Sequence, residues 1–191
     1  MEITILFLPL LASIISGFFG KFIGDRTSEI ITSLFVSISA ILSLLIFYNV
    51  ILNNYENNII IAKWISSGNL DVNWSIKVDA LSSVMLVVVT LVSALVHIYS
   101  IGYMSHDPHK PRFMAYLSLF TFAMLTLVTS DNFLQLFFGW EGVGLCSYFL
   151  IGFWFKKDTA NAAAIKAFVV NRVGDFGFAL GIFLIFYLFG T

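Results

Sequence analysis

The chain is poor in charge, in cysteine and in proline. Of its 191 residues, 11% are Asp, Glu, Lys or Arg and 59% are hydrophobic, and the mean hydropathy is +0.94. An ordinary soluble domain is about one quarter charged, so this chain has too little polar surface for a water-soluble fold. The single cysteine, Cys146, excludes a disulfide within the chain and a cysteine-ligated zinc or iron–sulfur site built by this chain alone. The composition leaves a polytopic membrane protein and excludes a soluble enzyme, a disordered tail and a secreted disulfide scaffold.

Signatures of bound cofactors are also missing. The formal net charge of −1 provides no basic surface for nucleic acid, and the sequence contains no GxGxxG run, P-loop or catalytic triad. His106 and His109 flank Asp107, but a solvated turn explains this cluster better than a metal site. We therefore expect no cofactor, no metal ion and no redox chemistry in this chain.

Long apolar runs predict six transmembrane helices. A membrane core of about 30 Å needs about 20 helical residues, and the runs that meet this length lie at 3–23, 30–52, 80–103, 113–129, 133–155 and 162–189. The first run lacks the basic start of a signal peptide and is followed by five more. The predicted fold class is therefore an all-α polytopic membrane protein.

The Lys and Arg residues of the short connections predict the orientation. One side of the predicted bundle carries Lys21, Arg26, Lys110, Arg112, Lys156 and Lys157, whereas the other carries only Lys63 and Lys77. Positive charge accumulates on the cytoplasmic side of membrane proteins. The first side should thus face the cytoplasm, or the matrix of a mitochondrion, with the N-terminus outside.

The longest connection, 53–79, predicts a short β-hairpin on the outer face. Apolar and polar residues alternate from 70 to 78, which is the period of a strand, and 59–65 also has strand character. Residues 66–69 have the composition of a turn. Asp79, with Ser82 and Ser83, suits the start of the third helix, and Asp131-Asn132 that of the fifth, where side-chain oxygens accept bonds from free N–H groups. We divide the chain into 1–77, with two helices and the hairpin, and 78–191, with helices three to six.

A carboxylate, Glu141, lies within the fifth predicted helix. It is 14 residues before Phe155, or about 21 Å at 1.5 Å per residue, so it lies well inside the bilayer. Charges at this depth are costly and are functional by default. Two readings stay open for Glu141: a relay that changes its protonation state when a cation moves, and a fixed ion pair that locks two helices together.

Four further ionisable groups lie within predicted helices. Asp175 follows Arg172 by three residues, so the two can form an ion pair on one side of the sixth helix, either structural or carrying protons. Lys166 points about 180° away from Asp175 and either extends to the membrane surface or faces another cavity. His97, in the third helix, is either a hydrogen-bonded core residue or part of a proton path.

Five motifs resemble a known family. They read VDALS at 78–82, LVHIYSIGYM at 95–104, RFMAYLS at 112–118, DNFLQLFFGWEGVGLCSY at 131–148 and NRVGDFG at 171–177. They are similar to subunit L (chain 5) of proton-pumping NADH:quinone oxidoreductases, respiratory complex I. The resemblance implies an antiporter-like fold in a bacterial or mitochondrial inner membrane and proton translocation driven by electron transfer from NADH to quinone.

The resemblance also implies roles and partners. Glu141 would pair with a lysine on a broken seventh helix, and Lys166, Arg172 and Asp175 would form the polar network beside that pair. NAD, FMN, iron–sulfur clusters and quinone would belong to partner subunits, and the partners would be other membrane-arm subunits and the lipid bilayer. Members of the family continue well past residue 191, so we expect an N-terminal fragment with an incomplete fold. Two alternatives are a subunit of a multisubunit cation/proton antiporter and a purely structural membrane segment.

Overall fold

The fold consists of six long helices and one two-stranded sheet. The computed structural model describes residues 1–53, 55–68 and 70–190. The elements are α1 (Glu2–Ile23), α2 (Asp25–Asn53), β1 (Asn57–Ser67), β2 (Leu70–Val78), α3 (Ala80–Tyr103), α4 (Lys110–Val128), α5 (Phe133–Ile151) and α6 (Asp158–Phe189). All six helices in the described residues are long and apolar enough to cross a membrane. The predicted fold class is confirmed.

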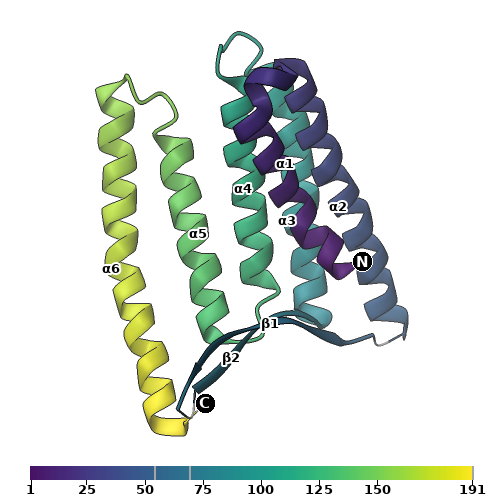
Figure 1. The fold of residues 1–191 in the computed structure, drawn as a ribbon, viewed down its shortest axis with the longest axis vertical. Helices are drawn as coiled ribbons and strands as arrows, with labels where there is room; N and C mark the ends of the chain where they lie inside the picture. Colours follow the sequence, from purple (N-terminus) through teal and green to yellow (C-terminus); the bar gives the residue numbers. More distant parts are fainter. Residues whose placement is uncertain (54, 69, 191) are drawn as a thin grey trace.

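The helices lie side by side, and α4 is at the centre of the packing. It contacts α1, α2, α3 and α5, whereas α6 packs against α5 at one edge of the bundle (Figure 1). Only 11% of the most apolar window of α6 is buried, against 39% for α4. Because lipid is as apolar as leucine, close packing and hydrogen bonds between helices hold such bundles together. Here Ser43 Oγ lies 2.7 Å from Thr90 Oγ1, and the Ser16 hydroxyl donates to the Pro111 carbonyl at 2.8 Å.

Two predicted boundaries are wrong at the end that carries most of the Lys and Arg residues. The fifth helix ends at Ile151 rather than at 155, and the sixth begins at Asp158 rather than at 162. Residues 152–156 form a turn in which the Phe153 carbonyl accepts a hydrogen bond from Arg112 Nη2 at 3.1 Å. The Phe153 ring packs edge-on against Phe113 of α4. Apolar turn residues that pack on a neighbouring helix are indistinguishable in sequence from one more helical turn.

Two other helices begin earlier than predicted. The second begins at Asp25 rather than at 30 and the fourth at Lys110 rather than at 113. Their first turns contain Asp25, Arg26 and Lys110, which lie outside the apolar runs on which the prediction depended. Charged residues extend these helices beyond the membrane core without changing which segments cross it.

The predicted hairpin is present and is anchored on the α4–α5 connection. β1 and β2 are antiparallel, with Ile59 opposite Ile76, and run beneath the ends of the helices from α2 toward α6 (Figure 1). The Gln135 side chain bonds both backbone groups of Ser75: its amide donates to the carbonyl at 2.7 Å, and its oxygen accepts from the N–H at 3.0 Å. Lys77 N–H donates to the Thr129 carbonyl at 2.9 Å. Asn69 of the predicted turn lies outside the described residues.

Asp79 caps α3 as predicted. Its carboxylate accepts from Ser82 N–H at 2.8 Å, and the Ser82 hydroxyl accepts from Asp79 N–H at 2.7 Å, which forms a capping box. Asn132 caps α5 in the same way by accepting from Gln135 N–H at 2.8 Å. These caps fix where each helix leaves the hairpin side of the bundle.

Substitution of Asp79 tests the first cap. We expect Asp79→Ala to destabilise the protein by about 0.5–2 kcal/mol. The hydrogen bond from Ser82 N–H lowers the pKa of Asp79 below its usual value. The ionised cap therefore stabilises the protein above the unfolded-state pKa, and this contribution is lost as the pH falls through the lower folded-state pKa. Thermal denaturation across acidic pH should show the difference between Asp79→Ala and the unaltered protein shrinking below about pH 4. A constant difference, or an equal loss in the exposed control Glu56→Ala, would contradict the cap.

Gly139 permits the close approach of α5 to α4. A Cβ atom at Gly139 would lie 2.7 Å from both the Cα and the N atom of Leu127, whereas one at Gly144 would meet nothing within 4 Å. Backbone cannot yield as a flexible side chain can, so Gly139→Ala should cost about 1–3 kcal/mol. Gly144→Ala is the matched control on the same helix. Equal thermal stability of the two variants in detergent would show that α4 and α5 are not in this contact.

Candidate ion-pair site

Helices α5 and α6 place three ionisable groups together near the middle of their lengths, at the edge of the bundle. Glu141 is 8 residues from the start of α5 and 10 from its end, or about 12 Å and 15 Å at the helical rise. Arg172 is 14 residues from the start of α6 and 17 from its end. Both residues therefore lie near the middle of helices that are long enough to cross a membrane, and the depth of Glu141 in the bilayer stays a prediction.

The Arg172 guanidinium lies between two carboxylates. Its Nη1 atom forms an ion pair and hydrogen bond with Glu141 Oε1, across the α5–α6 interface. The same Nη1 atom lies 3.8 Å from Asp175 Oδ2, three residues along α6. The other Asp175 oxygen, Oδ1, accepts a hydrogen bond from the Trp140 indole at 2.8 Å. One fixed cation is thus shared by two acids.

Burial differs strongly among the three groups. The side chain of Asp175 is 9% exposed, that of Glu141 23% and that of Arg172 49%. The guanidinium also lies over the Phe168 ring, 4.8 Å from its centroid. A cavity of about 250 Å³ adjoins the cluster, and its lining includes Trp140, Gly144, Ser147, Asn171 and Asp175. The lining is mostly apolar, and its polar groups come from Ser147, Asn171 and Asp175.

This arrangement suits charge movement more than chemistry on a substrate. Arg172 stays protonated in proteins, so only the two carboxylates can exchange a proton. Movement of the guanidinium would switch which of the two acids it pairs with. Such switching needs a movement of α6 against α5 or a second cation that competes for Glu141.

The structure brings together some of the predicted residues and not others. The Arg172–Asp175 pair is present, and Arg172 also reaches Glu141, which is the geometry of the fixed-pair reading. Lys166 is exposed and forms no ion pair with any residue that the structure describes. Sequence reasoning missed Trp140 as the hydrogen-bond donor to Asp175. The one available signal was the indole N–H of Trp140, a hydrogen-bond donor directly before Glu141 in the sequence, although Trp140 is 51% exposed.

His97 belongs to a different interface, between α3 and α4. It is fully buried, with Nδ1 2.8 Å from the Ser93 carbonyl and Nε2 3.0 Å from Ser118 Oγ. The carbonyl can only accept, so Nδ1 carries the proton and Nε2 accepts from the Ser118 hydroxyl. Ser93 Oγ lies 3.3 Å from His97 Nδ1 and 2.5 Å from Thr121 Oγ1, so these four side chains form a chain of hydrogen-bonding groups with Ser118 at the other end. Both ring nitrogens have partners, as the hydrogen-bonded core reading requires.

The fold defines a polytopic helical membrane protein. One solved structure with this fold is a chain of the archaeal membrane-bound sulfane sulfur reductase, a respiratory membrane complex, with a TM-score of 0.80 and 18% identity. The match covers all of this chain and 38% of that one. Two family models also match: "NADH-Ubiquinone oxidoreductase (complex I), chain 5 N-terminus" over 64–114, and "NADH:quinone oxidoreductase/Mrp antiporter, TM" over 130–191.

Curated relatives identify the family. The chain is 60% identical over 191 residues to NADH-ubiquinone oxidoreductase chain 5 of Triticum aestivum, covering 100% of this chain and 28% of the relative. It is 54% identical over 188 residues to NADH-quinone oxidoreductase subunit L of Rickettsia bellii, covering 98% of this chain and 29% of the relative. The chain belongs to the chain 5/subunit L family of NADH:quinone oxidoreductases. It spans less than a third of the length of these relatives.

Proposed function

We propose that the chain is part of a membrane-arm subunit that translocates protons, coupled to electron transfer from NADH to quinone. The observation that carries this proposal is the ion pair between Glu141 and Arg172 at mid-membrane, with Asp175 as a second acid. An acid that shares one cation with a neighbour can take up and release a proton when that cation moves. The coupled reaction, electron transfer from NADH to quinone, is inferred from the names of the relatives in Triticum aestivum and Rickettsia bellii.

The proposal assigns distinct roles to the site residues. Glu141 takes up and releases the proton, Arg172 and Asp175 set the balance of charge around it, and Lys166 serves a separate cavity or the membrane surface. For His97, the hydrogen bonds on both ring nitrogens favour a positioning role over a proton path. The division at residue 77/78 between an N-terminal part with the hairpin and the start of the helical repeat is part of the same proposal.

The reaction needs partner subunits. NAD, FMN, iron–sulfur clusters and quinone would be bound there, and this chain would contribute no redox centre and bind no nucleic acid. The partners are other membrane-arm subunits in a bacterial inner membrane or a mitochondrial inner membrane. Lys21, Arg26, Lys110 and Arg112 lie near one end of the bundle and Lys63 and Lys77 on the hairpin, which supports an N-terminus on the outer side.

A second candidate is a subunit of a multisubunit cation/proton antiporter, without electron transfer. The family model that matches 130–191 carries both names in its description, and the same carboxylate–guanidinium cluster could serve exchange of a cation for a proton. The two candidates differ in a simple observable. Cation/proton exchange that persists in vesicles without NADH and quinone would favour the antiporter.

Glu141→Gln in the assembled complex tests the proposed function. We expect fewer protons translocated per electron than in the unaltered complex, because an amide keeps the shape of the side chain but cannot take up a proton. The ratio is measured in vesicles from proton uptake and NADH oxidation recorded together. Glu56→Gln, which neutralises an exposed carboxylate beside the hairpin, is the control. An unchanged number of protons per electron in a fully assembled Glu141→Gln complex would contradict the proposed role of Glu141 in proton uptake and release.

A further inference from the structure

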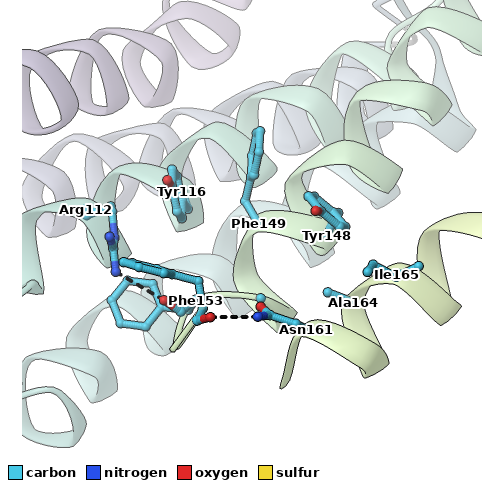
Figure 2. A pocket seen from close by; sticks show the side chains of 10 residues that line it. Arg112, Tyr116, Tyr148, Phe149, Phe153, Asn161, Ala164 and Ile165 are labelled. Atoms are coloured by element: carbon cyan, nitrogen blue, oxygen red, sulfur yellow. Dashed lines mark hydrogen bonds between the residues drawn. The ribbon is translucent and has the colours of Figure 1, made fainter. Parts of the chain in front are cut away.

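A second cavity lies where α4 begins, α5 ends and α6 begins. Its volume is about 430 Å³, and its lining includes Arg112, Tyr116, Tyr148, Phe149, Asn161 and Ile165 (Figure 2). Arg112 is in the first turn of α4, and Asn161 is in the first turn of α6. The cavity therefore lies at the ends of these helices, and its lining residue Tyr148 is 7 residues, or about two helical turns, from Glu141 along α5.

Arg112 brings a guanidinium to this cavity with most of its donors unused. Nη2 donates to the Phe153 carbonyl at 3.1 Å, and the buried Nε atom has no hydrogen-bond partner. The group lies 4.6 Å from the Phe153 ring centroid and 5.2 Å from that of Phe155, which holds its plane in place. No carboxylate of the described residues forms an ion pair with Arg112. The nearby Asp107 is hydrogen-bonded to the Trp154 indole at 2.9 Å.

The surroundings of Arg112 suit an anionic amphiphile. Lys156 and Lys157 lie in the turn beside the cavity, and Lys157 Nζ lies 5.1 Å from the Trp154 ring centroid. On the other side, Phe149 and Ile165 continue the lining toward the membrane interior (Figure 2). A guanidinium presents several donors to phosphate oxygens, and basic pockets between helices at this depth suit lipid headgroups.

We propose that this cavity binds the phosphate of an anionic phospholipid through Arg112, with an acyl chain along Phe149 and Ile165. Lys156 and Lys157 follow the lining residue Phe155 in sequence and add positive charge to this end of the bundle. The site is separate from the Glu141 cluster, so this proposal does not depend on the proposed function.

Chemical protection of Arg112 tests the site without any substitution. The full complex is reconstituted in phosphatidylcholine alone or with about one fifth phosphatidylglycerol, treated with phenylglyoxal, and analysed by peptide mass spectrometry. We expect modification of Arg112 to fall in the anionic vesicles, while that of exposed Arg26 changes little. Equal modification of Arg112 in both vesicles, including none in either, would overturn the proposal. Equal protection by millimolar inorganic phosphate would identify a phosphate site in place of a lipid site.

A labelling experiment adds a second, independent readout. A phosphatidylglycerol with a photoreactive acyl chain should label peptides containing Phe149 or Ile165, and a phosphatidylcholine with the same chain should label them less. Arg112→Gln should reduce the anionic labelling by about tenfold, the size expected for losing a charged hydrogen bond. Arg26→Gln removes the same charge from the same end of the bundle and should leave labelling unchanged. Equal labelling by both lipids, or an equal loss in both variants, would overturn the site.

Discussion

Replacing Arg172 by glutamine should destabilise the α5–α6 pair by about 1–3 kcal/mol, less than the loss of a fully buried ion pair, because the Arg172 side chain is 49% exposed. The substitution removes the one cation that lies between Glu141 and Asp175, and it leaves two acids in the membrane interior facing each other. An unpaired charged side chain at the centre of a membrane helix costs about 2.5–3.5 kcal/mol on insertion scales. The loss should be at the lower end of this range if the adjoining 250 Å³ cavity holds water.

A double-mutant cycle isolates the contribution of the ion pair. Stability is measured as thermal denaturation of the detergent-solubilised complex for Arg172→Gln, Glu141→Gln and the double variant. If the pair forms, the double variant is more stable than the sum of the single losses predicts, because Glu141 is no longer left as an unpaired charge and only Asp175 has lost its cation. Arg26→Gln, at an exposed position near the start of α2, is the matched control. Additive losses would show that Arg172 and Glu141 do not interact in the assembled protein.

The sequence predicts which segments cross the membrane because that depends on hydrophobicity averaged over about 20 residues. It also predicts the hairpin, whose alternation from Leu70 to Val78 is a local pattern, and the caps at Asp79 and Asn132. Boundaries near Phe153 and Phe155 fail because these rings pack on α4 and Arg112 rather than continuing α5. A local sequence pattern does not show which apolar residues pack against another helix and which continue their own.

Some contacts of the ion-pair site also follow from local sequence spacing, whereas others depend on tertiary packing. The Arg172–Asp175 pair follows from a spacing of three residues on one helix. The partnership of Arg172 with Glu141 depends on how α6 is rotated against α5, and the bond from Trp140 to Asp175 depends on the same angle. A single sequence gives the depth of each residue but not this rotation. Packing of Phe178 of α6 on Phe137 and Trp140 of α5 supports the observed angle.

His97→Ala should destabilise the protein by about 2–5 kcal/mol, the range for deleting a large buried side chain. The imidazole is fully buried and accepts the Ser118 hydroxyl, so its loss leaves a cavity and a hydroxyl without its partner on α3. Ile98→Ala is the control, because Ile98 is the next residue on α3 and is 55% exposed. Thermal denaturation should separate the two variants clearly. Similar losses would show that α3 and α4 do not pack through His97.

His97→Gln then separates a positioning role from a proton path. Glutamine retains a donor and an acceptor, so it can bond the Ser93 carbonyl and the Ser118 hydroxyl, and we expect it to regain most of the stability lost in His97→Ala. It cannot be protonated near neutral pH. Since both ring nitrogens of His97 are already occupied by groups of α3 and α4, we expect His97→Gln to keep the number of protons translocated per electron. A stable His97→Gln complex with a lower ratio would instead show that His97 passes protons, and the chain Ser118–His97–Ser93–Thr121 would become the first candidate for their route.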